Sequence, residues 1–292
     1  MPPQAKNVAV IGLGIMGSAI AENLIAAGFA VAGYDTDAGR TAALAAAGGT
    51  PGASAGEVAR GCAVALTSLP STAALDSTVD SLLAAPQSGL VVAELSTFPI
   101  EAKLAARDRL AGAGMTMLDC PLSGTGAQAR TRDLALYGSG DQAAFESCRE
   151  VFAGFARVSH YLGEFGNGSR MKFVANLLVA VHNAAAAEAI VLGAKSGLHP
   201  ERILEVIGSG AGTSRIFELR GPMMAKGVYT PVTATMHVLQ KDSAIIAAFA
   251  RSLGVDTPML AAAAPLYDEA DAQGHGEEDV AAVHAVLARR AK

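Results

Sequence analysis

The sequence predicts an α/β domain followed by an all-helical domain, with a long helix linking the two. Short apolar runs alternate with helical patterns through the first half of the 292-residue chain. Such alternation is typical of crossover units and a parallel sheet. From about residue 168, nearly every segment has helical periodicity instead. We therefore expect domains at 1–165 and 166–292, divided within the glycine-rich stretch 163–169.

The expected strands of the first domain are short apolar runs, and the expected helices lie between them. The strands are expected at 7–12, 30–35, 62–70, 89–97, 115–121, 133–139 and 157–163. The helices are expected at 15–28, in the alanine-rich stretch before about residue 47, and at 72–84, 99–114 and 141–153. In the second domain, breaks that contain glycine or proline are expected to separate the helices. These breaks lie at 197–200, 208–212, 227–231, 254–258 and 274–278.

The composition argues against several classes of protein. Hydrophobic residues make up 51% of the chain, which is enough for a sizeable core. The net charge is −5 and no basic run stands out, which argues against binding to nucleic acid. Cys62, Cys120 and Cys148 lack the spacing of a disulfide framework or a zinc site, so we expect a reducing compartment and no metal. The N-terminus has no signal-peptide pattern, and we therefore expect a cytoplasmic protein.

Residues 173–194 are apolar and long enough to raise the question of a membrane span. Polar side chains interrupt the run at Asn176, His182, Asn183 and Glu188. The centre of a bilayer penalises such groups. We therefore interpret the segment as part of a helix of roughly 25 residues, buried in a soluble protein and long enough to span two domains.

The stretch "GLGIMG" has the spacing of a dinucleotide-binding loop. Gly12, Gly14 and Gly17 follow an expected strand and open an expected helix, and an acidic residue ends the next strand at Asp35. Gly12 permits the tight turn, Gly14 lets the backbone approach a pyrophosphate, and Gly17 lets helix and strand pack closely. The helix N-terminus attracts the anion. A purely structural turn is the alternative, but this context favours a bound nucleotide.

Asp35 bears on which nucleotide is bound. A carboxylate at this position accepts hydrogen bonds from a ribose 2′-hydroxyl and repels a 2′-phosphate. The sequence therefore predicts NAD as the cofactor. Arg40 lies five residues later and favours a phosphate, which leaves NADP as the alternative.

The stretch "DCPLSGTG" turns sharply after a strand, at Ser123, Gly124 and Thr125. Successive backbone N–H groups in such a turn can form an anion-binding concavity, and the serine hydroxyl is a further donor. Taken by itself the stretch also fits an ordinary Ser-Gly turn.

Lys172 and Asn176 are one helical turn apart and share a helix face. One interpretation is that Lys172 extends to water near the helix start. The other is a catalytic lysine whose ammonium is partly desolvated, which would lower its pKa toward a useful acid–base range. Asn176 would then orient the same substrate oxygen.

These motifs, in this order, resemble the β-hydroxyacid dehydrogenase family, and the resemblance covers nearly the whole chain. "GLGIMG" resembles the G-x-G-x-M-G loop of the family, and "GNGSRMKFVAN" resembles its G-x-G-x-x-x-K-x-x-x-N element. The other matching stretches are "SLP" at 68–70, "ELST" at 94–97, "DCPLSGTG" at 119–126 and "LQKD" at 239–242. Thr125, where the family usually has glycine, and Ala175, where several members have Asn or His, depart from the pattern.

The resemblance implies an N-terminal Rossmann domain, an all-α C-terminal domain and an active site in the cleft between them. It implies that Lys172 is the catalytic acid–base and that the substrate binds at Ser123, Gly124, Thr125 and Asn176. It also implies a set of cofactor contacts. These are Gly12, Leu13, Gly14, Ile15, Met16, Asp35, Leu69, Pro70, Thr97 and Lys241.

The implied function is reversible hydride transfer between NAD and a small β-hydroxy acid, giving the oxo acid or semialdehyde. A reductase of short aldehyde acids such as glyoxylate or succinic semialdehyde remains an alternative. An imine reductase or a catalytically silent NAD(P)-binding protein is disfavoured, because both are expected to lack lysine at position 172. The family also implies a homodimer or homotetramer, with a small carboxylate as partner rather than nucleic acid or membrane.

Overall fold

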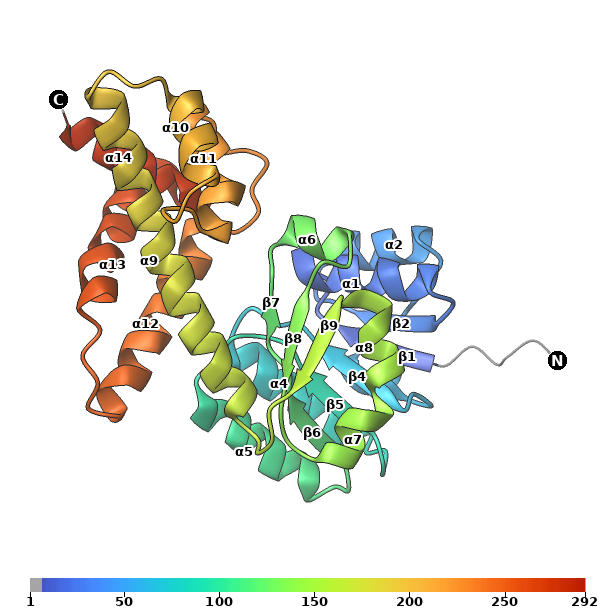
Figure 1. The fold of residues 1–292 in the computed structure, drawn as a ribbon. Helices are drawn as coiled ribbons and strands as arrows, with labels where there is room; N and C mark the ends of the chain where they lie inside the picture. The colour runs from blue at the N-terminus through green and yellow to red at the C-terminus, as the bar shows by residue number, and fades with distance from the viewer. Residues whose placement is uncertain (1–6, 292) are drawn as a thin grey trace. The chain divides into compact units, whose positions relative to one another are not determined.

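The computed structural model describes residues 7–291, which divide after Lys172 into two compact units (Figure 1). This division lies seven residues beyond the boundary at residue 165 that the sequence predicts. It lies inside one continuous helix, α9 (Asn167–Lys195). The first turns of α9 belong to the first unit and the rest belongs to the second.

The first unit contains a six-stranded sheet with the strand order β3-β2-β1-β4-β5-β6, and all of its pairs are parallel. The strands are β1 (Asn7–Ile11), β2 (Ala30–Tyr34), β3 (Thr50–Pro51), β4 (Val64–Thr67), β5 (Val91–Glu94) and β6 (Thr116–Asp119). Every residue of β4 and β5 is buried, as expected for parallel strands covered on both faces. The predicted parallel sheet is confirmed for β1, β2, β4, β5 and β6, whereas β3 was not among the expected strands.

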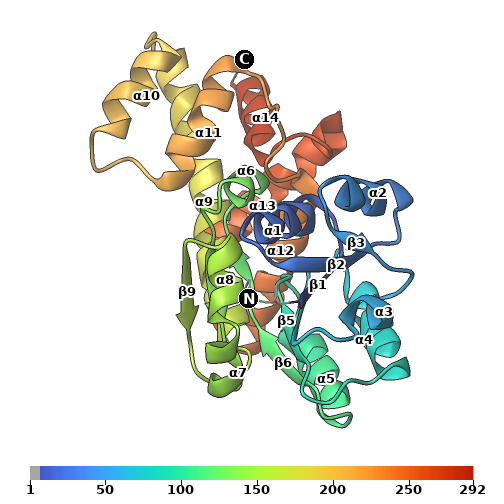
Figure 2. The same cartoon turned by 90° about the vertical axis from the view of Figure 1, so that its right-hand side faces the viewer.

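Helices cover both faces of this sheet (Figure 2). The helices that follow its strands are α1 (Ile15–Ala26), α2 (Ala38–Ala46), α3 (Ala55–Ala59), α4 (Thr72–Ala84) and α5 (Ile100–Ala111). Alternate residues of β1 enter two separate hydrophobic cores: Val8 and Val10 pack with α1, whereas Ala9 and Ile11 pack with α3 and α4. The period of two in a strand thus gives each face its own core.

A second, three-stranded sheet follows the first, with the order β7-β8-β9. Its elements are β7 (Leu122–Ser123), α6 (Gly126–Arg130), β8 (Ala135–Gly138), α7 (Gln142–Ser147), α8 (Arg149–Phe155) and β9 (Val158–Tyr161). β7 pairs antiparallel to β8, so these strands do not extend the parallel sheet as the alternating pattern predicts. An isolated bridge between Asp119 and Ser139 connects the two sheets.

The second unit consists of helices around α9, and no β-strand occurs within residues 173–291. After α9 come α10 (Pro200–Gly208), α11 (Arg215–Lys226), α12 (Met236–Ser252), α13 (Pro258–Ala270), η1 (Asp271–His275), η2 (Val280–Ala282) and α14 (Val283–Arg290). The predicted breaks separate these helices. Gly227, directly after α11, has φ 61°, and Gly254, two residues after the end of α12, has φ 67°.

By length and composition alone, α9 could cross a membrane. The other helices of the second unit nevertheless cover one of its faces. Asn183 is 0% exposed, and its Nδ2 donates to the Val280 carbonyl at 2.9 Å. The Tyr267 hydroxyl from α13 donates to the Ala180 carbonyl at 2.6 Å. On this face α9 packs as an interior helix of a globular unit.

Candidate active site

The glycine loop after β1 is shaped by close backbone contacts. Gly12 has φ +87°, and a Cβ there would lie 2.2 Å from the Ser68 carbonyl oxygen. A Cβ at Gly17 would lie 1.8 Å from the Gly12 carbonyl oxygen. Any side chain at either position would therefore force the backbone apart. These contacts fit the roles predicted for the tight turn and for the close packing of helix and strand.

Gly14 is the N-cap of α1, and no side chain caps this helix end. A Cβ at Gly14 would meet only the Arg40 guanidinium, at 4.0 Å. The first N–H groups of a helix without a cap attract an anion. The loop is therefore chemically suited to a pyrophosphate. Of the neighbouring loop residues, Leu13 is buried, Met16 is half-buried and Ile15 is 56% exposed.

Asp35 follows β2 and holds the glycine loop from one side. Its Oδ2 accepts from the Leu13 N–H at 2.7 Å, and its Oδ1 accepts from the Asp37 N–H at 2.9 Å. Arg40 Nη1 lies 3.3 Å from Oδ2. Burial by itself raises the pKa of Asp35, but the two backbone donors and Arg40 outweigh it and lower the pKa below its usual value. Asp35 is therefore an ionised acceptor at neutral pH.

The remaining predicted cofactor residues of the first unit lie on loops after β4 and β5. Leu69 and Thr97 are half-buried, and Pro70 is exposed. The Leu69 N–H donates to Ser96 Oγ at 2.8 Å, which ties the two loops together. Because parallel strands end at one edge of a sheet, the loops after β1, β2, β4 and β5 meet there. The strand order reverses between β1 and β4, the place where such sheets bind nucleotides.

The turn at Ser123 to Thr125 joins β7 to α6. Gly124 has φ +136°, and a Cβ there would lie 2.5 Å from Leu134 Cδ2, so only glycine fits. Thr125 is the N-cap of α6 and forms a capping box with Gln128. The Thr125 N–H donates to Gln128 Oε1 at 3.0 Å. One of the N–H groups predicted for anion binding therefore already has an acceptor within the chain.

Lys172 and Asn176 lie one turn apart on α9 and are buried, at 9% and 8% exposure. The second unit brings Asn176 next to two residues of α12. Asn176 Nδ2 donates to Asp242 Oδ2 at 2.7 Å, and Lys241 Nζ lies 3.0 Å from Asp242 Oδ1. Because the amide nitrogen faces a carboxylate, the Asn176 Oδ1 atom is fixed on the other side as an acceptor.

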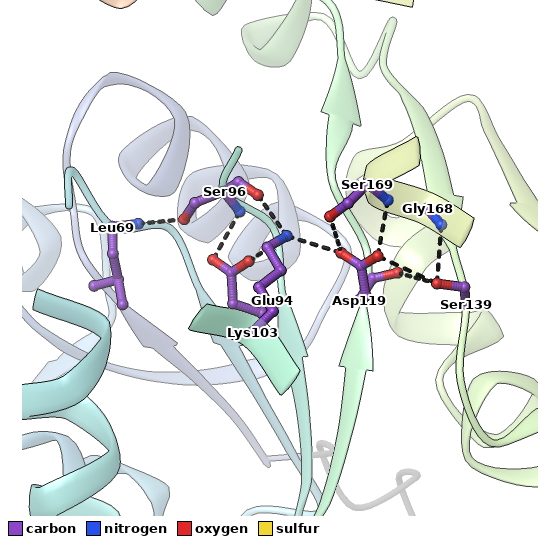
Figure 3. A network of polar contacts seen from close by, with 8 residues as sticks. All are labelled: Leu69, Glu94, Ser96, Lys103, Asp119, Ser139, Gly168 and Ser169. Atoms are coloured by element: carbon purple, nitrogen blue, oxygen red, sulfur yellow. Dashed lines mark hydrogen bonds and ion pairs between the residues drawn. The ribbon is translucent and has the colours of Figure 1, made fainter. Parts of the chain in front are cut away.

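Sequence reasoning assigned no role to Asp242, although it stands in the "LQKD" stretch. It also missed a buried polar network of Glu94, Lys103 and Asp119, drawn in Figure 3. Glu94 and Asp119 each end a buried strand, and a carboxylate at such a position is a pattern in the sequence that indicates a buried polar network. Lys103 sits in a helix of mixed composition and gave no signal. Within residues 7–291, no group of three or more His, Cys, Asp or Glu side chains is placed to hold a metal ion.

Comparison with known proteins agrees with this layout. Residues 7–163 match the family described as the NAD binding domain of 6-phosphogluconate dehydrogenase. Residues 166–287 match the family described as NAD-binding of NADP-dependent 3-hydroxyisobutyrate dehydrogenase. Both halves of the chain are thus matched, and both families bind a nicotinamide dinucleotide.

Individual relatives match along almost their whole length. The chain is 38% identical to L-threonate dehydrogenase from Cupriavidus necator, over 96% of this chain and 95% of the relative. It is 31% identical to glyoxylate/succinic semialdehyde reductase 1 from Arabidopsis thaliana, over 95% of this chain and 96% of the relative. The solved structure of a 3-hydroxyisobutyrate dehydrogenase from Salmonella typhimurium has a TM-score of 0.88 at 29% identity, covering 96% of this chain and 99% of that chain. The chain therefore belongs to the β-hydroxyacid dehydrogenase family of NAD(P)-dependent oxidoreductases.

Proposed function

We propose that the protein is an NAD-dependent dehydrogenase that oxidises a hydroxyl group of a small hydroxy acid, with Lys172 as the acid–base. The observation that carries the proposal is the buried pair on α9, Lys172 with the oriented amide of Asn176. On one face of a largely apolar helix, a lysine can exchange a proton with a hydroxyl or carbonyl oxygen, and an amide can bind and orient the substrate.

In the proposed reaction, NAD supplies the hydride acceptor, and the protein supplies position and electrostatics. Lys172 hydrogen-bonds the reacting oxygen: as the neutral amine it takes up the hydroxyl proton during oxidation, and as the ammonium it returns that proton during reduction. Asn176 Oδ1, held by the contact of Nδ2 with Asp242, accepts from a substrate hydroxyl and fixes its orientation. The turn at Ser123 and Gly124 binds the substrate carboxylate, with the Ser123 hydroxyl as one donor. The hydroxyl of Thr125 is engaged with Gln128 and shapes this turn instead.

The preference for NAD rests on Asp35. Its carboxylate is ionised and paired with Arg40, so a 2′-phosphate would meet a negative charge and would have to draw Arg40 away from its partner. The acid that we propose first is a polyhydroxy acid of the threonate type, supported by the relative with 38% identity. A second candidate, the reduction of short aldehyde acids, is supported by the plant reductase with 31% identity.

We further propose a homodimer or homotetramer in a reducing compartment such as the cytoplasm. Large apolar side chains on α9 are exposed, with Val174 at 59% and Leu192 at 71%, and association would cover them. Cys62, Cys120 and Cys148 are free and buried, in keeping with a reducing compartment.

The test is a screen for NAD and NADP reduction over threonate, glycerate, 3-hydroxyisobutyrate and gluconate-type acids. The reverse direction is assayed with NADH and with glyoxylate or succinic semialdehyde. We expect turnover of at least one hydroxy acid, with a higher kcat/KM for NAD than for NADP. A mock purification from host cells that do not express the protein is the control for contaminating dehydrogenases. Turnover of no acid or aldehyde above this control would refute the activity, and a higher kcat/KM for NADP would refute the cofactor preference.

A further inference from the structure

A lysine that is not part of the proposed chemistry lies at the centre of a buried polar network (Figure 3). Lys103, on α5, is 1% exposed. Its Nζ lies 2.6 Å from Glu94 Oε2 and 2.8 Å from Asp119 Oδ1, and it donates to the Ser96 carbonyl at 2.7 Å. The ammonium thus donates two hydrogen bonds, to Asp119 Oδ1 and to the Ser96 carbonyl, and forms an ion pair with Glu94. The side chain is therefore fixed in one position.

One arm of the network reaches the loops after β4 and β5, where the family resemblance implies cofactor contacts at Leu69, Pro70 and Thr97. Glu94 Oε1 accepts from the Ser96 N–H at 2.8 Å. Ser96 Oγ in turn accepts from the Leu69 N–H at 2.8 Å. The loops after β4 and β5 are thus held to each other and to Lys103.

The other arm reaches the first turn of α9. Asp119 Oδ1 accepts from Ser169 Oγ, and Asp119 Oδ2 accepts from the Ser169 N–H, both at 2.8 Å. Ser139 Oγ accepts from the Gly168 N–H at 2.9 Å and lies 3.3 Å from Asp119 Oδ2. A Cβ at Gly168 would lie 2.6 Å from the Asp119 carbonyl oxygen, so the helix begins directly against the end of β6. Ser169 is three residues before Lys172, on the same helix face.

The charges of the network are costly to bury. Burial raises the pKa of Glu94, and the nearby Lys103 offsets this only in part. For Lys103, burial alone lowers the pKa, but Asp119 and Glu94 outweigh it and raise the pKa above its ordinary value. Asp119 also faces the positive end of the α9 dipole. Replacing a buried ion pair with apolar residues of similar volume often leaves the stability of a core unchanged or raises it. Stability alone therefore does not account for such a network.

We propose that Lys103 is a positioning residue, which holds two parts of the site in a fixed relation to each other. Through Ser96 it holds the loops at Leu69 and Thr97. Through Asp119 and Ser169 it holds the turn of α9 that carries Lys172. This proposal rests on the proposed function, which assigns Lys172 to the chemistry, and on the cofactor contacts that the family resemblance implies at these loops. The network links both within the first unit.

The experiment cuts each arm separately, because Lys103→Met would leave two buried carboxylates and could prevent folding. Ser169→Ala removes one hydroxyl donor to Asp119 but keeps the backbone bond. We expect kcat to fall about 10-fold, since small displacements of a catalytic group are costly, with KM for NAD nearly unchanged. The pH at which kcat is half-maximal should also move, because the surroundings of Lys172 change. Ser96→Ala should instead raise KM for NAD about 10-fold and leave kcat nearly unchanged.

The matched control is Gln87→Ala, which removes a polar bridge at the other end of the sheet, between the loops that precede β4 and β5. Gln87 Oε1 accepts from the Gly61 N–H at 2.8 Å, and its Nε2 donates to the Cys62 carbonyl. This variant should lose stability but keep the kinetic constants and the pH profile when it is assayed well below its Tm. If Ser169→Ala and Ser96→Ala behave like Gln87→Ala, the network is only structural and the positioning proposal is wrong.

Lys172→Ala, measured alongside, separates this failure from failure of the proposed function. An inactive Lys172→Ala with an unaffected Ser169→Ala refutes the positioning role alone. A fully active Lys172→Ala refutes the acid–base role, and the positioning role with it.

Discussion

The glycine loop after β1 and the polar face of α9 are both predicted to bind the reactants, but they are built differently. The loop is built from backbone: Gly12 and Gly17 sit where a Cβ would strike a carbonyl oxygen. The face of α9 is built from side chains: Asn176 depends on Asp242, 66 residues further along the chain. A backbone site is local and tolerates no side chain. A side-chain site depends on distant partners and is adjusted by single substitutions.

The largest expected effect breaks the backbone site. Gly17→Ala places a Cβ 1.8 Å from the Gly12 carbonyl oxygen, so the strand and the helix must separate. We expect a loss of stability of about 3 kcal/mol or more and no detectable NAD binding, measured by thermal unfolding and by NADH fluorescence titration. Gly28→Ala is the control. It has φ +89° but no atom within 4 Å of its Cβ, so it should cost about 1–2 kcal/mol and leave NAD binding intact. Equal NAD affinity in the two variants would show that the loop does not depend on close packing.

The second effect concerns the chemistry on α9. Lys172→Ala should lower kcat about 10²–10⁴-fold, the usual contribution of an acid–base group. NAD affinity should remain close to that of the wild type, because the glycine loop is untouched. Steady-state kinetics and NADH titration check both parts. Loss of NAD affinity in Lys172→Ala would show that NAD binding at the glycine loop also depends on the polar face of α9.

The third effect tests the dependence of the side-chain site on a distant partner. Asp242→Ala leaves the Asn176 amide without its acceptor, and hydrogen bonds to charged groups contribute about 1.5–3 kcal/mol. We therefore expect kcat/KM for the acid to fall about 10- to 100-fold. Lys241→Ala keeps Asp242 and should act mainly on KM for NAD. If both variants change the same constant by the same factor, Asp242 does not act through Asn176.

The smallest expected effect lies at the turn after β7. Thr125→Ala removes the side-chain cap of α6 and should cost about 1 kcal/mol of stability. KM for the acid should change little, because the Thr125 hydroxyl is engaged with Gln128 rather than with substrate. Thr125→Ser keeps the cap and should be neutral. A large rise in KM for Thr125→Ala alone would place this hydroxyl in the substrate site after all.

The same contrast explains what the sequence could predict. The glycine spacing, Asp35 and the strand ends follow from local patterns, and five of the six parallel strands lie where such patterns predict them. β3 (Thr50–Pro51) was not predicted, because two residues are too few to show a strand pattern. The separate sheet β7-β8-β9 was not predicted, because the direction in which a short strand such as Leu122–Ser123 pairs depends on tertiary contacts. Neither the capping of α6 by Thr125 nor the burial of Lys103 was predicted. The Thr-x-x-Gln spacing at 125–128 is a capping-box signature that could have predicted the cap. The burial of Lys103 depends on which partners the fold brings near, and no spacing rule encodes that.

The continuity of α9 across the division of the chain has one more consequence. Lys172 ends the first unit and Asn176 lies in the second, yet they are only four positions apart in one unbroken helix. Inserting a single residue between them would turn Asn176 by about 100° around the helix axis relative to Lys172. Surface loops can lengthen without such an effect. The protein should therefore tolerate length changes in its connections but not between these two side chains.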